Sequence, residues 1–534
     1  MNKIQAVILS LLSAVLMSLA WPANGFAPLI FVAWVPLLFV QDQLGQSGKK
    51  GMFWLAWLCF FVWNALTTWW IWNSTEVGAI GAILLNSFFM TVVFWMFHLS
   101  KKFMYDNRKG FAILIFYWLS WEWFHLDWDL SWPWLNLGHV FSTQHKWIQW
   151  YEYTGVAGGT AWILVVNIMV FQLIRNLGSD KTPINRIWKQ AAGILTVILI
   201  PILASLWIYH SYEESGQAVN VVVVQPNLDP YSEQYGLAPE SVIQRNLELA
   251  LQKLDEDTDF IVAPESAIQE EIWEEQLHKS SGLNILKSFI AQHPKTAILI
   301  GASTFSMVPN GMEAHPAARK FRTMEGYYFA YNTVFYLDST SYIQSYHKSK
   351  LTPGVEMMPS WWWLRPLRNY AIDLGGTVGT LKTDEERQVF LNQDKRFRIA
   401  PVICYESVYG EFVTRYIRRG ANLIFIATND GWWGNTPGYK QHLEFAKLRA
   451  IETRRSIARS ANTGVSAFVD QRGELYQTTA YWQPDVIKQK LITNEKITVY
   501  VRFGDYIARV ALFVSAIFLI NAIIRRILKL QKAL

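Results

Sequence analysis

Long apolar runs fill the first 210 residues of the chain and return once near its C-terminus. Each run approaches the length of about 20 residues that an α-helix needs to cross the hydrocarbon core of a bilayer. Seven runs precede residue 211 and one follows residue 504, at roughly 4–22, 25–41, 52–73, 78–99, 110–126, 155–174, 190–210 and 505–524. The pattern predicts a membrane α-helical bundle of about eight transmembrane helices.

The polar stretch between residues 211 and 504 has a different pattern, in which short apolar runs alternate with amphipathic helical segments. Strands are expected at 219–225, 259–265, 296–303, 397–406, 422–430 and 465–471, and helices at 238–254, 282–292, 407–419 and 438–459. Continuously apolar strands are typical of sheets covered on both faces, so we expect an α/β sandwich. The predicted domains are 1–210 (seven helices), 211–504 (α/β) and 505–534 (one helix and a basic tail).

Charge between the runs orients the bundle. If the N-terminus is cytoplasmic and the runs alternate, fifteen Lys and Arg residues fall on the cytoplasmic side and only Lys146 falls in a short outside loop. This asymmetry is a strong positive-inside signal. It places the 211–504 domain outside the cytoplasm and both chain termini inside.

Composition agrees with this division. Of the 27 Trp residues, 20 precede residue 211. The formal net charge of +6 is explained by basic residues between the runs, so no nucleic-acid partner is expected.

Cys59 lies in an apolar run and Cys404 in the polar half, which argues against a disulfide. No His/Cys cluster has zinc spacing, and neither a metal nor a cofactor is expected.

Three polar residues stand at the ends of predicted strands. Glu265 ends one strand, Cys404 ends another, and Lys348 follows the turn after a third. Ligand groups gather at the carboxyl ends of strands in α/β sheets. A helix predicted directly after Cys404 would favour the thiolate through its dipole.

Each of these residues alone has an ordinary structural explanation. A lone Cys is more often a small buried hydrophobe, a lone Glu after Pro a turn or cap residue, and a lone Lys a solvated side chain. Together they supply a nucleophile, a base and an oxyanion stabiliser, which are the parts that acyl transfer needs.

The contexts of these residues resemble the nitrilase, or carbon–nitrogen hydrolase, superfamily. Glu265 lies in APESAI, Lys348 in YHKSKLTP and Cys404 in ICYES, and the segment NDGWWG at 429–434 is also similar. That superfamily uses a Glu–Lys–Cys triad on an αββα sandwich. With its membrane half, including WEWFHLDWDLSWPWLNLG at 121–138, the chain resembles the apolipoprotein N-acyltransferase family of bacterial inner membranes.

The resemblance implies a reaction and its partners. An acyl chain would pass from a glycerophospholipid to the Cys404 thiol and then to the α-amino group of the diacylglyceryl-cysteine of an apolipoprotein. The expected partners are therefore the phospholipid donor, the diacylated apolipoprotein acceptor and the membrane. We expect a monomeric, cofactor-free, multi-pass protein of the bacterial inner membrane with its catalytic domain in the periplasm.

Further residues are candidates for supporting roles. Glu356 would orient Lys348 or share its proton handling, and Tyr405 and Glu406 would shape the oxyanion pocket; each also has a structural alternative. Candidate substrate-binding residues are Tyr235, Trp361, Trp362, Trp363, Asn429 and Trp432. The three consecutive Trp residues fit a gating loop or, equally, a patch at the membrane interface.

Two rival functions remain open on the sequence. A membrane-tethered amidase or nitrilase would need the same triad, although one helix would suffice as its anchor. An inactive lipid-binding scaffold would not need Glu265, Lys348 and Cys404 together.

Overall fold

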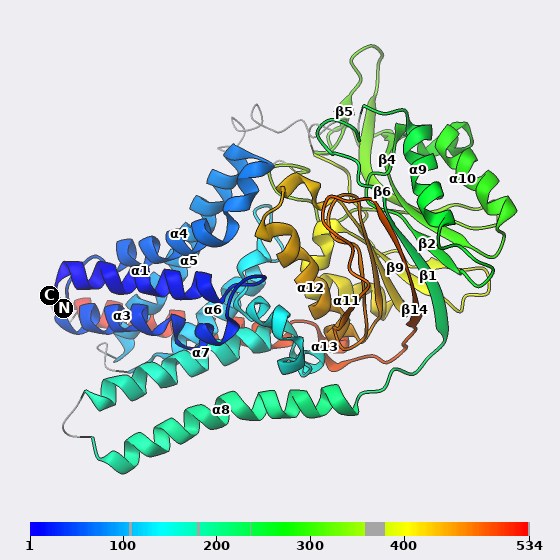
Figure 1. The fold of residues 1–534 in the computed structure, drawn as a ribbon. Coiled ribbons are helices and arrows are strands. Elements are labelled where there is room, and N and C mark those ends of the chain that lie inside the picture. The colour runs from blue at the N-terminus through cyan, green and yellow to red at the C-terminus, as the bar shows by residue number, and fades with distance from the viewer. Residues whose placement is uncertain (106–108, 179–181, 235, 358–379, 532–534) are drawn as a thin grey trace. The chain divides into compact units, whose positions relative to one another are not determined.

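The computed structural model describes residues 1–105, 109–178, 182–234, 236–357 and 380–531 (Figure 1). Its contacts divide the chain into two compact units. One comprises Met1–Trp72, Glu76–Ser211 and Phe503–Leu534, and the other comprises Asn73–Thr75 and Tyr212–Arg502. The first is helical and the second is α/β, which confirms the fold class expected from the sequence.

The helical unit contains the predicted apolar helices. They are α1 (Lys3–Ala20), α2 (Ile30–Ala33), α3 (Val35–Ser47), α4 (Met52–Thr68), α5 (Glu76–Tyr105), α6 (Ala112–Phe124), α7 (Tyr151–Leu177), α8 (Ile184–Ser211) and α14 (Tyr506–Gln531). Within the described residues, seven helical segments are long and apolar enough to cross a membrane; the second of them, Ala27–Ser47, includes α2 and α3.

The expected span at 110–126 differs from the others. It is helix α6, whose 13 residues extend for about 20 Å, less than the roughly 30 Å of a hydrocarbon core. After α6 the chain forms 3-10 turns at Pro133–Leu135 and Leu137–Trp147. Helix α6 ends at Phe124, before the aromatic and acidic segment that follows it, so the sequence pattern overestimated this span.

A buried carboxylate joins these turns to the bundle. Glu122 in α6 accepts hydrogen bonds from Trp118 Nε1 at 3.1 Å, from the backbone N–H of Leu137 at 2.7 Å and from Thr160 Oγ1 at 2.7 Å. A buried acceptor that has three donors is stabilised in place. Glu122 therefore fixes the start of the Leu137–Trp147 segment against α6 and α7.

The α/β unit contains two sheets. The larger has the order β14–β1–β2–β4–β6–β5, with β3 paired to β4 and β7 to β6. Its strands are β1 (Ala218–Gln225), β2 (Phe260–Val262), β3 (Ile268–Trp273), β4 (Ala297–Met307), β5 (Arg319–Lys320), β6 (Tyr327–Leu337), β7 (Gln344–His347) and β14 (Asp485–Ile492). The smaller has the order β13–β12–β11–β10–β9–β8. Its strands are β8 (Phe390–Leu391), β9 (Arg398–Ile403), β10 (Leu423–Thr428), β11 (Ile457–Ala461), β12 (Ala467–Val469) and β13 (Leu475–Tyr476).

Helices cover the outer face of each sheet, which makes four layers (Figure 1). Helices α9 (Pro239–Leu251) and α10 (Ser281–Gln292) pack on the larger sheet through a buried cluster that includes Ile243, Leu286 and Ile298. Helices α11 (Gly410–Arg418) and α12 (Pro437–Thr453) cover the smaller sheet. The inner faces meet through pairs such as Phe260 and Phe425, whose ring centroids are 5.4 Å apart.

Several elements differ from the sequence interpretation, and two of them lie next to candidate site residues or alter the smaller sheet. The helix expected at 438–459 ends at Thr453, because Arg454 adopts the left-handed conformation with φ of 52°, and the next residues form β11 between β10 and β12. The short strand β7, which directly precedes Lys348, was also missed. Both strands are too short and too polar to show a period-2 pattern, so only their pairing reveals them.

Candidate active site

Strand ends bring the three candidate residues to one edge of the sandwich. Cys404 directly follows β9, Glu265 lies three residues beyond β2, and Lys348 directly follows β7. Strands β9, β10 and β11 run parallel, as do β1, β2 and β4, so their carboxyl ends share an edge within each sheet. The site therefore draws residues from both sheets.

Lys348 bridges two carboxylates. Its Nζ lies 3.1 Å from Glu265 Oε1 and 2.8 Å from Glu356 Oε1, and only 2% of its side chain is exposed. Burial by itself would lower the pKa of Lys348, but the two carboxylates and the nearby Cys404 outweigh burial and raise that pKa well above its usual value. The two carboxylates thus favour the charged ammonium form of Lys348 beside Glu265.

Asn332 in β6 also bridges these carboxylates, and the sequence analysis missed it. Its Nδ2 donates to Glu265 Oε1 at 2.7 Å and to Glu356 Oε1 at 3.2 Å. Its backbone oxygen accepts from the Lys348 N–H at 2.8 Å, which fixes the start of the lysine loop. The available signal was a single amide side chain inside the apolar strand that ends in NTVFYLD.

Cys404 occupies a constrained backbone position at the start of a 3-10 turn, Cys404–Val408. Its φ of 47° lies in the left-handed region, which is uncommon for a residue with a side chain. The next helix, α11, begins only at Gly410. The α-helix expected at 407–419 is therefore present as α11, but a 3-10 turn separates it from the thiol.

The Cys404 thiol is buried, and its surroundings favour the neutral form. Burial is the main cause that raises the pKa of Cys404, the Glu265 carboxylate raises it further, and Lys348 lowers it. This direction is opposite to the lowering expected from a helix dipole. A neutral thiol requires a base to remove its proton during attack, and Glu265 is the carboxylate that acts on it most strongly.

Glu406 links the cysteine turn to the lysine loop. Its Oε1 accepts from the Tyr346 hydroxyl and from the Ser349 N–H, both at 2.7 Å, and its Oε2 accepts from the Ile403 N–H at 2.8 Å. Its side chain is fully buried, and burial raises its pKa. The neighbouring Tyr405 packs edge-on against Tyr409, with ring centroids 5.1 Å apart.

The predicted binding residues divide into two groups. Asn429 Nδ2 donates to Gln234 Oε1 at 2.7 Å, and Gln234 Nε2 donates at 2.9 Å to the carbonyl of Ser266, the residue after Glu265. Gln234, which the sequence analysis did not single out, therefore connects Asn429 to the Glu265 turn. Trp432 packs edge-on against Tyr231 at 5.1 Å. Four further candidates, Tyr235, Trp361, Trp362 and Trp363, lie outside the described residues.

A close backbone approach holds Glu265 in place. Gly301 in β4 lies so near that a Cβ built on it would be 2.6 Å from Glu265 Cα and 2.6 Å from Ser266 N. Its own N–H donates to the Pro264 carbonyl at 3.0 Å. Only glycine leaves room for this contact.

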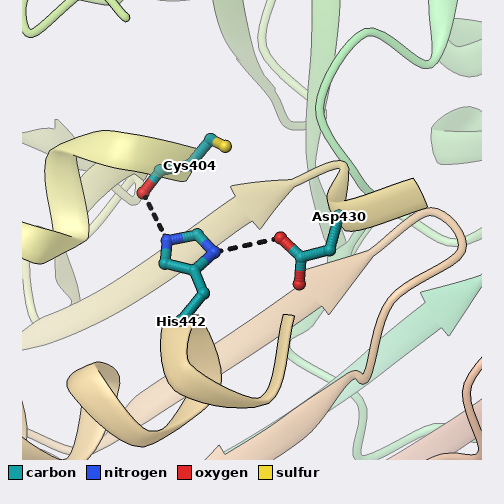
Figure 2. Close-up of side chains that lie close together, drawn as sticks. All are labelled: Cys404, Asp430 and His442. Carbon is teal, nitrogen blue, oxygen red and sulfur yellow. Dashed lines mark hydrogen bonds and ion pairs between the residues drawn. The ribbon is translucent and has the colours of Figure 1, made fainter. Parts of the chain in front are cut away.

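Cys404, Asp430 and His442 form a group whose potential ligand atoms lie within 4.8 Å of one another. Their hydrogen bonds favour another use than metal binding. Asp430 Oδ2 pairs with Arg459 Nη2 at 2.6 Å, and the His442 ring contacts Asp430 Oδ1 and the Cys404 carbonyl. In Figure 2 the sulfur points away from the ring, whereas the carbonyl oxygen faces it. The Cys404 sulfur lies within 4.8 Å of both side chains, but Asp430 and His442 make their hydrogen bonds with Arg459, with each other and with the Cys404 carbonyl.

Comparison with known families decides the classification. The model of the family described as carbon-nitrogen hydrolase matches residues 220–495, more than half of the chain. This chain belongs to the carbon–nitrogen hydrolase family. A second model, described as the apolipoprotein N-acyltransferase N-terminal domain, matches residues 13–169. Both parts of the resemblance found in the sequence are confirmed.

Relatives of this carbon–nitrogen hydrolase family member extend along almost the whole chain. A protein of Chlorobaculum tepidum named apolipoprotein N-acyltransferase is 29% identical over 528 residues, which are 97% of this chain and 96% of that protein. A protein of Geobacter metallireducens with the same name is 24% identical over 94% of this chain and 92% of its own. Among solved structures, an amidase from a Nesterenkonia species is 14% identical, covers 55% of this chain and 97% of its own, and has a TM-score of 0.36.

Proposed function

We propose that this protein is an apolipoprotein N-acyltransferase. It moves an acyl chain from a glycerophospholipid, through a thioester on Cys404, to the α-amino group of the N-terminal diacylglyceryl-cysteine of an apolipoprotein. The observation that carries the proposal is the buried Lys348 ammonium, bonded to Glu265 and Glu356 and electrostatically coupled to the Cys404 thiol. The matches along the chain to proteins of that name support the substrate assignment.

In the first half-reaction Cys404 attacks an ester carbonyl of the phospholipid. As the S–C bond forms, Glu265 takes the thiol proton, because the raised pKa of Cys404 leaves little thiolate at rest. The Lys348 ammonium and backbone N–H groups near Tyr405 stabilise the oxyanion; one such donor is typically worth about 2.7–4 kcal/mol. The C–O bond then breaks, Glu265 returns the proton to the leaving oxygen, and lysophospholipid departs.

In the second half-reaction the α-amino group of the apolipoprotein attacks the thioester. A C–N bond forms, the C–S bond breaks, and Glu265 takes a proton from the amine and returns one to the thiolate. Lys348 stabilises the second oxyanion in the same position. The products are the amide and the free thiol, so protons balance over the cycle and no cofactor is consumed.

The membrane helices suit substrates with acyl chains. Moving a chain from the bilayer into water costs about 0.8 kcal/mol per CH₂ group, and both substrates carry such chains. A catalytic domain anchored by several helices lets each head-group end reach the thiol while the chains stay in lipid. The charge asymmetry supports a multi-pass inner-membrane protein whose catalytic domain is periplasmic and whose termini are cytoplasmic.

The rival functions explain less of the chain. An amidase or nitrilase with a tether would leave the match of residues 13–169 to an acyltransferase domain without a purpose. An inactive scaffold would have no use for a buried lysine between two carboxylates beside a thiol. Release of ammonia from small amides or nitriles, without acyl transfer to a lipopeptide, would favour the hydrolase.

Mass spectrometry of the purified protein tests the proposal. Given phospholipid alone, the peptide containing Cys404 should gain one acyl mass, and a diacylated lipopeptide should remove it and gain the same mass. Cys404→Ala should abolish both changes, Glu265→Gln should stop acylation, and Lys348→Ala should slow it by about 10²–10³-fold.

Two variants serve as matched controls for this experiment. Cys59→Ala removes the other buried cysteine, which lies in α4, and should leave acylation intact. Lys295→Ala removes a lysine whose ion pair with Asp257 is exposed, and should do the same. A Cys404→Ala protein that still N-acylates the lipopeptide would refute the assignment.

A further inference from the structure

The peptide that joins Cys404 to Tyr405 carries unusual side-chain contacts on its carbonyl. The Ser407 hydroxyl donates to the Cys404 oxygen at 2.7 Å, and His442 Nε2 lies 3.2 Å from the same oxygen. His442 Nε2 is also 2.9 Å from Ser407 Oγ. All these groups are buried. Two polar side chains therefore surround one carbonyl oxygen next to the nucleophile.

The ring of His442 is held in one orientation. Its Nδ1 lies 3.0 Å from Asp430 Oδ1, which also accepts from Thr428 Oγ1 at 3.0 Å. The other oxygen of Asp430 pairs with Arg459, so the carboxylate stays charged in a fully buried position. We assign a hydrogen to Nε2, because Ser407 gives its single hydrogen to the Cys404 oxygen and Nε2 then faces two acceptors, that oxygen and Ser407 Oγ (Figure 2).

This arrangement has an electronic consequence for the same peptide. Donors on a carbonyl oxygen withdraw electron density from the amide, so its N–H becomes a stronger donor; cooperative strengthening is estimated at about 10–30% per bond. The N–H of the Cys404–Tyr405 peptide is on Tyr405, adjacent to the nucleophile. It is among the backbone donors that the proposed mechanism uses for the oxyanion.

We propose that His442, oriented by Asp430, and Ser407 are positioning residues that polarise the Cys404–Tyr405 peptide for oxyanion stabilisation. The inference rests on the proposed acyl transfer, because it concerns the transition state of that reaction. None of the three side chains bonds to substrate in this scheme. They act through the carbonyl of Cys404.

A separate contact holds the shape of the turn. Arg449 lies seven residues after His442 on α12, and its Nη1 donates to the Val408 carbonyl at 2.6 Å and to the Ser407 carbonyl at 3.2 Å. Arg449 thus fixes the far end of the turn without touching the Cys404 carbonyl. Removing the Ser407 hydroxyl should therefore weaken the polarisation of the Cys404–Tyr405 peptide, while Arg449 still holds the turn in place.

The test compares four variants of the full-length protein in a bilayer mimetic. Ser407→Ala removes one donor and a single heavy atom, His442→Leu removes the other donor, and His442→Gln keeps an N–H near the Nε2 position. Ser456→Ala is the matched control, because the buried Ser456 hydroxyl also donates to a backbone carbonyl, that of Ile492, at 2.7 Å. Ser456 precedes β11, at the strand end opposite the site.

Two measurements are made on each variant. Single-turnover acylation by phospholipid gives the rate of thioester formation and the half-saturating lipid concentration. Infrared difference spectroscopy with ¹³C-labelled acyl donor gives the C=O stretch of the thioester, whose frequency reports the strength of the oxyanion donors. Misfolding alone lowers the fraction of active enzyme and leaves that frequency unchanged.

We expect Ser407→Ala to slow acylation by about threefold to tenfold with little change in half-saturation, a fraction of the effect of losing an oxyanion donor. Its thioester stretch should move to higher frequency. His442→Leu should show larger changes, His442→Gln smaller ones than Leu, and Ser456→Ala none. An unchanged acylation rate and thioester frequency in both Ser407→Ala and His442→Leu would overturn this inference but not the proposed function. An equal loss of acylation rate in Ser456→Ala would do the same. A wild-type protein that forms no thioester would instead overturn the proposed function and, with it, this inference.

Discussion

Asn332 donates a 2.7 Å hydrogen bond from its amide nitrogen to Glu265 Oε1, and the same nitrogen reaches Glu356. The buried Glu265 and the partly buried Glu356 share Lys348 and need further donors, because like charges close together repel each other. The amide supplies such a donor without adding a charge. It therefore keeps Glu265 in the position from which it can take the thiol proton.

Replacing this amide should impair chemistry more than folding. Asn332→Leu leaves both carboxylates with one hydrogen-bond donor fewer. The lost hydrogen bond destabilises the arrangement of Glu265 by about 1–3 kcal/mol, and acylation should therefore slow by at least about tenfold. Asn332→Asp adds a third carboxylate and should slow acylation more than Asn332→Leu does. Rates of thioester formation and thermal unfolding measure the two effects. Asn246→Leu, at a buried amide in α9 that donates to Val242, should lower stability without a selective loss of rate.

The close approach of Gly301 to Glu265 yields a second prediction. Gly301→Ala would place a Cβ 2.6 Å from Glu265 Cα, and because the neighbour is backbone, the Glu265 turn must move. Acylation should fall by about tenfold or more, because misplacing a reacting group by an ångström is costly. Gly178→Ala meets only ordinary contacts of 3.8 Å or more and should leave the rate unchanged. A fully active Gly301→Ala protein would mean that the turn tolerates displacement.

A third prediction concerns pH and His347, the residue before Lys348. Burial opposes its positive charge, but Asp384 at 2.8 Å and Glu274 at 2.7 Å outweigh burial and raise the pKa of His347 to about 9. A folded-state pKa above the ordinary value of about 6.5 stabilises the fold fully below pH ~6.5, and this stabilisation is lost as pH rises through ~9. It amounts to on the order of 3 kcal/mol.

Unfolding curves between pH 6 and 10 measure this effect. The wild type should lose stability across the upper part of that range, whereas His347→Gln should be less stable at pH 6 and should change less with pH. His293→Gln serves as a control, because His293 lies at the end of α10 and has no ion pair among those found in the described residues. Parallel curves for the wild type and His347→Gln would contradict the assignment of the charge to His347.

The topology gives a fourth prediction. In a Cys404→Ala background, a cysteine at the exposed Tyr342 should react with a membrane-impermeant maleimide in intact spheroplasts, because the catalytic domain is proposed to be periplasmic. A cysteine at the exposed Ile184, at the start of α8, should react only after permeabilisation. The reverse pattern would invert the proposed orientation.

The fold was predictable where periodicity is strong. The apolar helices and strands β1, β4 and β10 follow from long uniform runs, because crossing a lipid bilayer demands apolar side chains of the helices and burial between layers demands them of the strands. Strand β11 was hidden within a helical pattern, since the left-handed Arg454 that ends α12 has no glycine to mark it. The shortness of α6 was hidden as well, because hydropathy measures apolarity and not where a helix stops.

The candidate site was predictable only at its motif residues. Glu265, Lys348 and Cys404 stand at strand ends, a position that sequence reveals. Asn332 and Gln234 support them across separations of 67 and 32 residues, distances at which only the folded sheet decides contact. The resting state of the thiol also depended on burial, which reversed the expected direction of its pKa shift.

Glu406 accepts hydrogen bonds from the lysine loop and from the end of β9, which belong to different sheets. Glu406 therefore connects the two sheets of the sandwich. If one sheet slid over the other, the hydrogen bonds of the buried Glu406 carboxylate would have to break before Cys404 could separate from Lys348. Glu406 thus keeps the reacting groups aligned when the domain core fluctuates. Mutations that loosen the interface between the sheets should be tolerated better far from Glu406 than close to it.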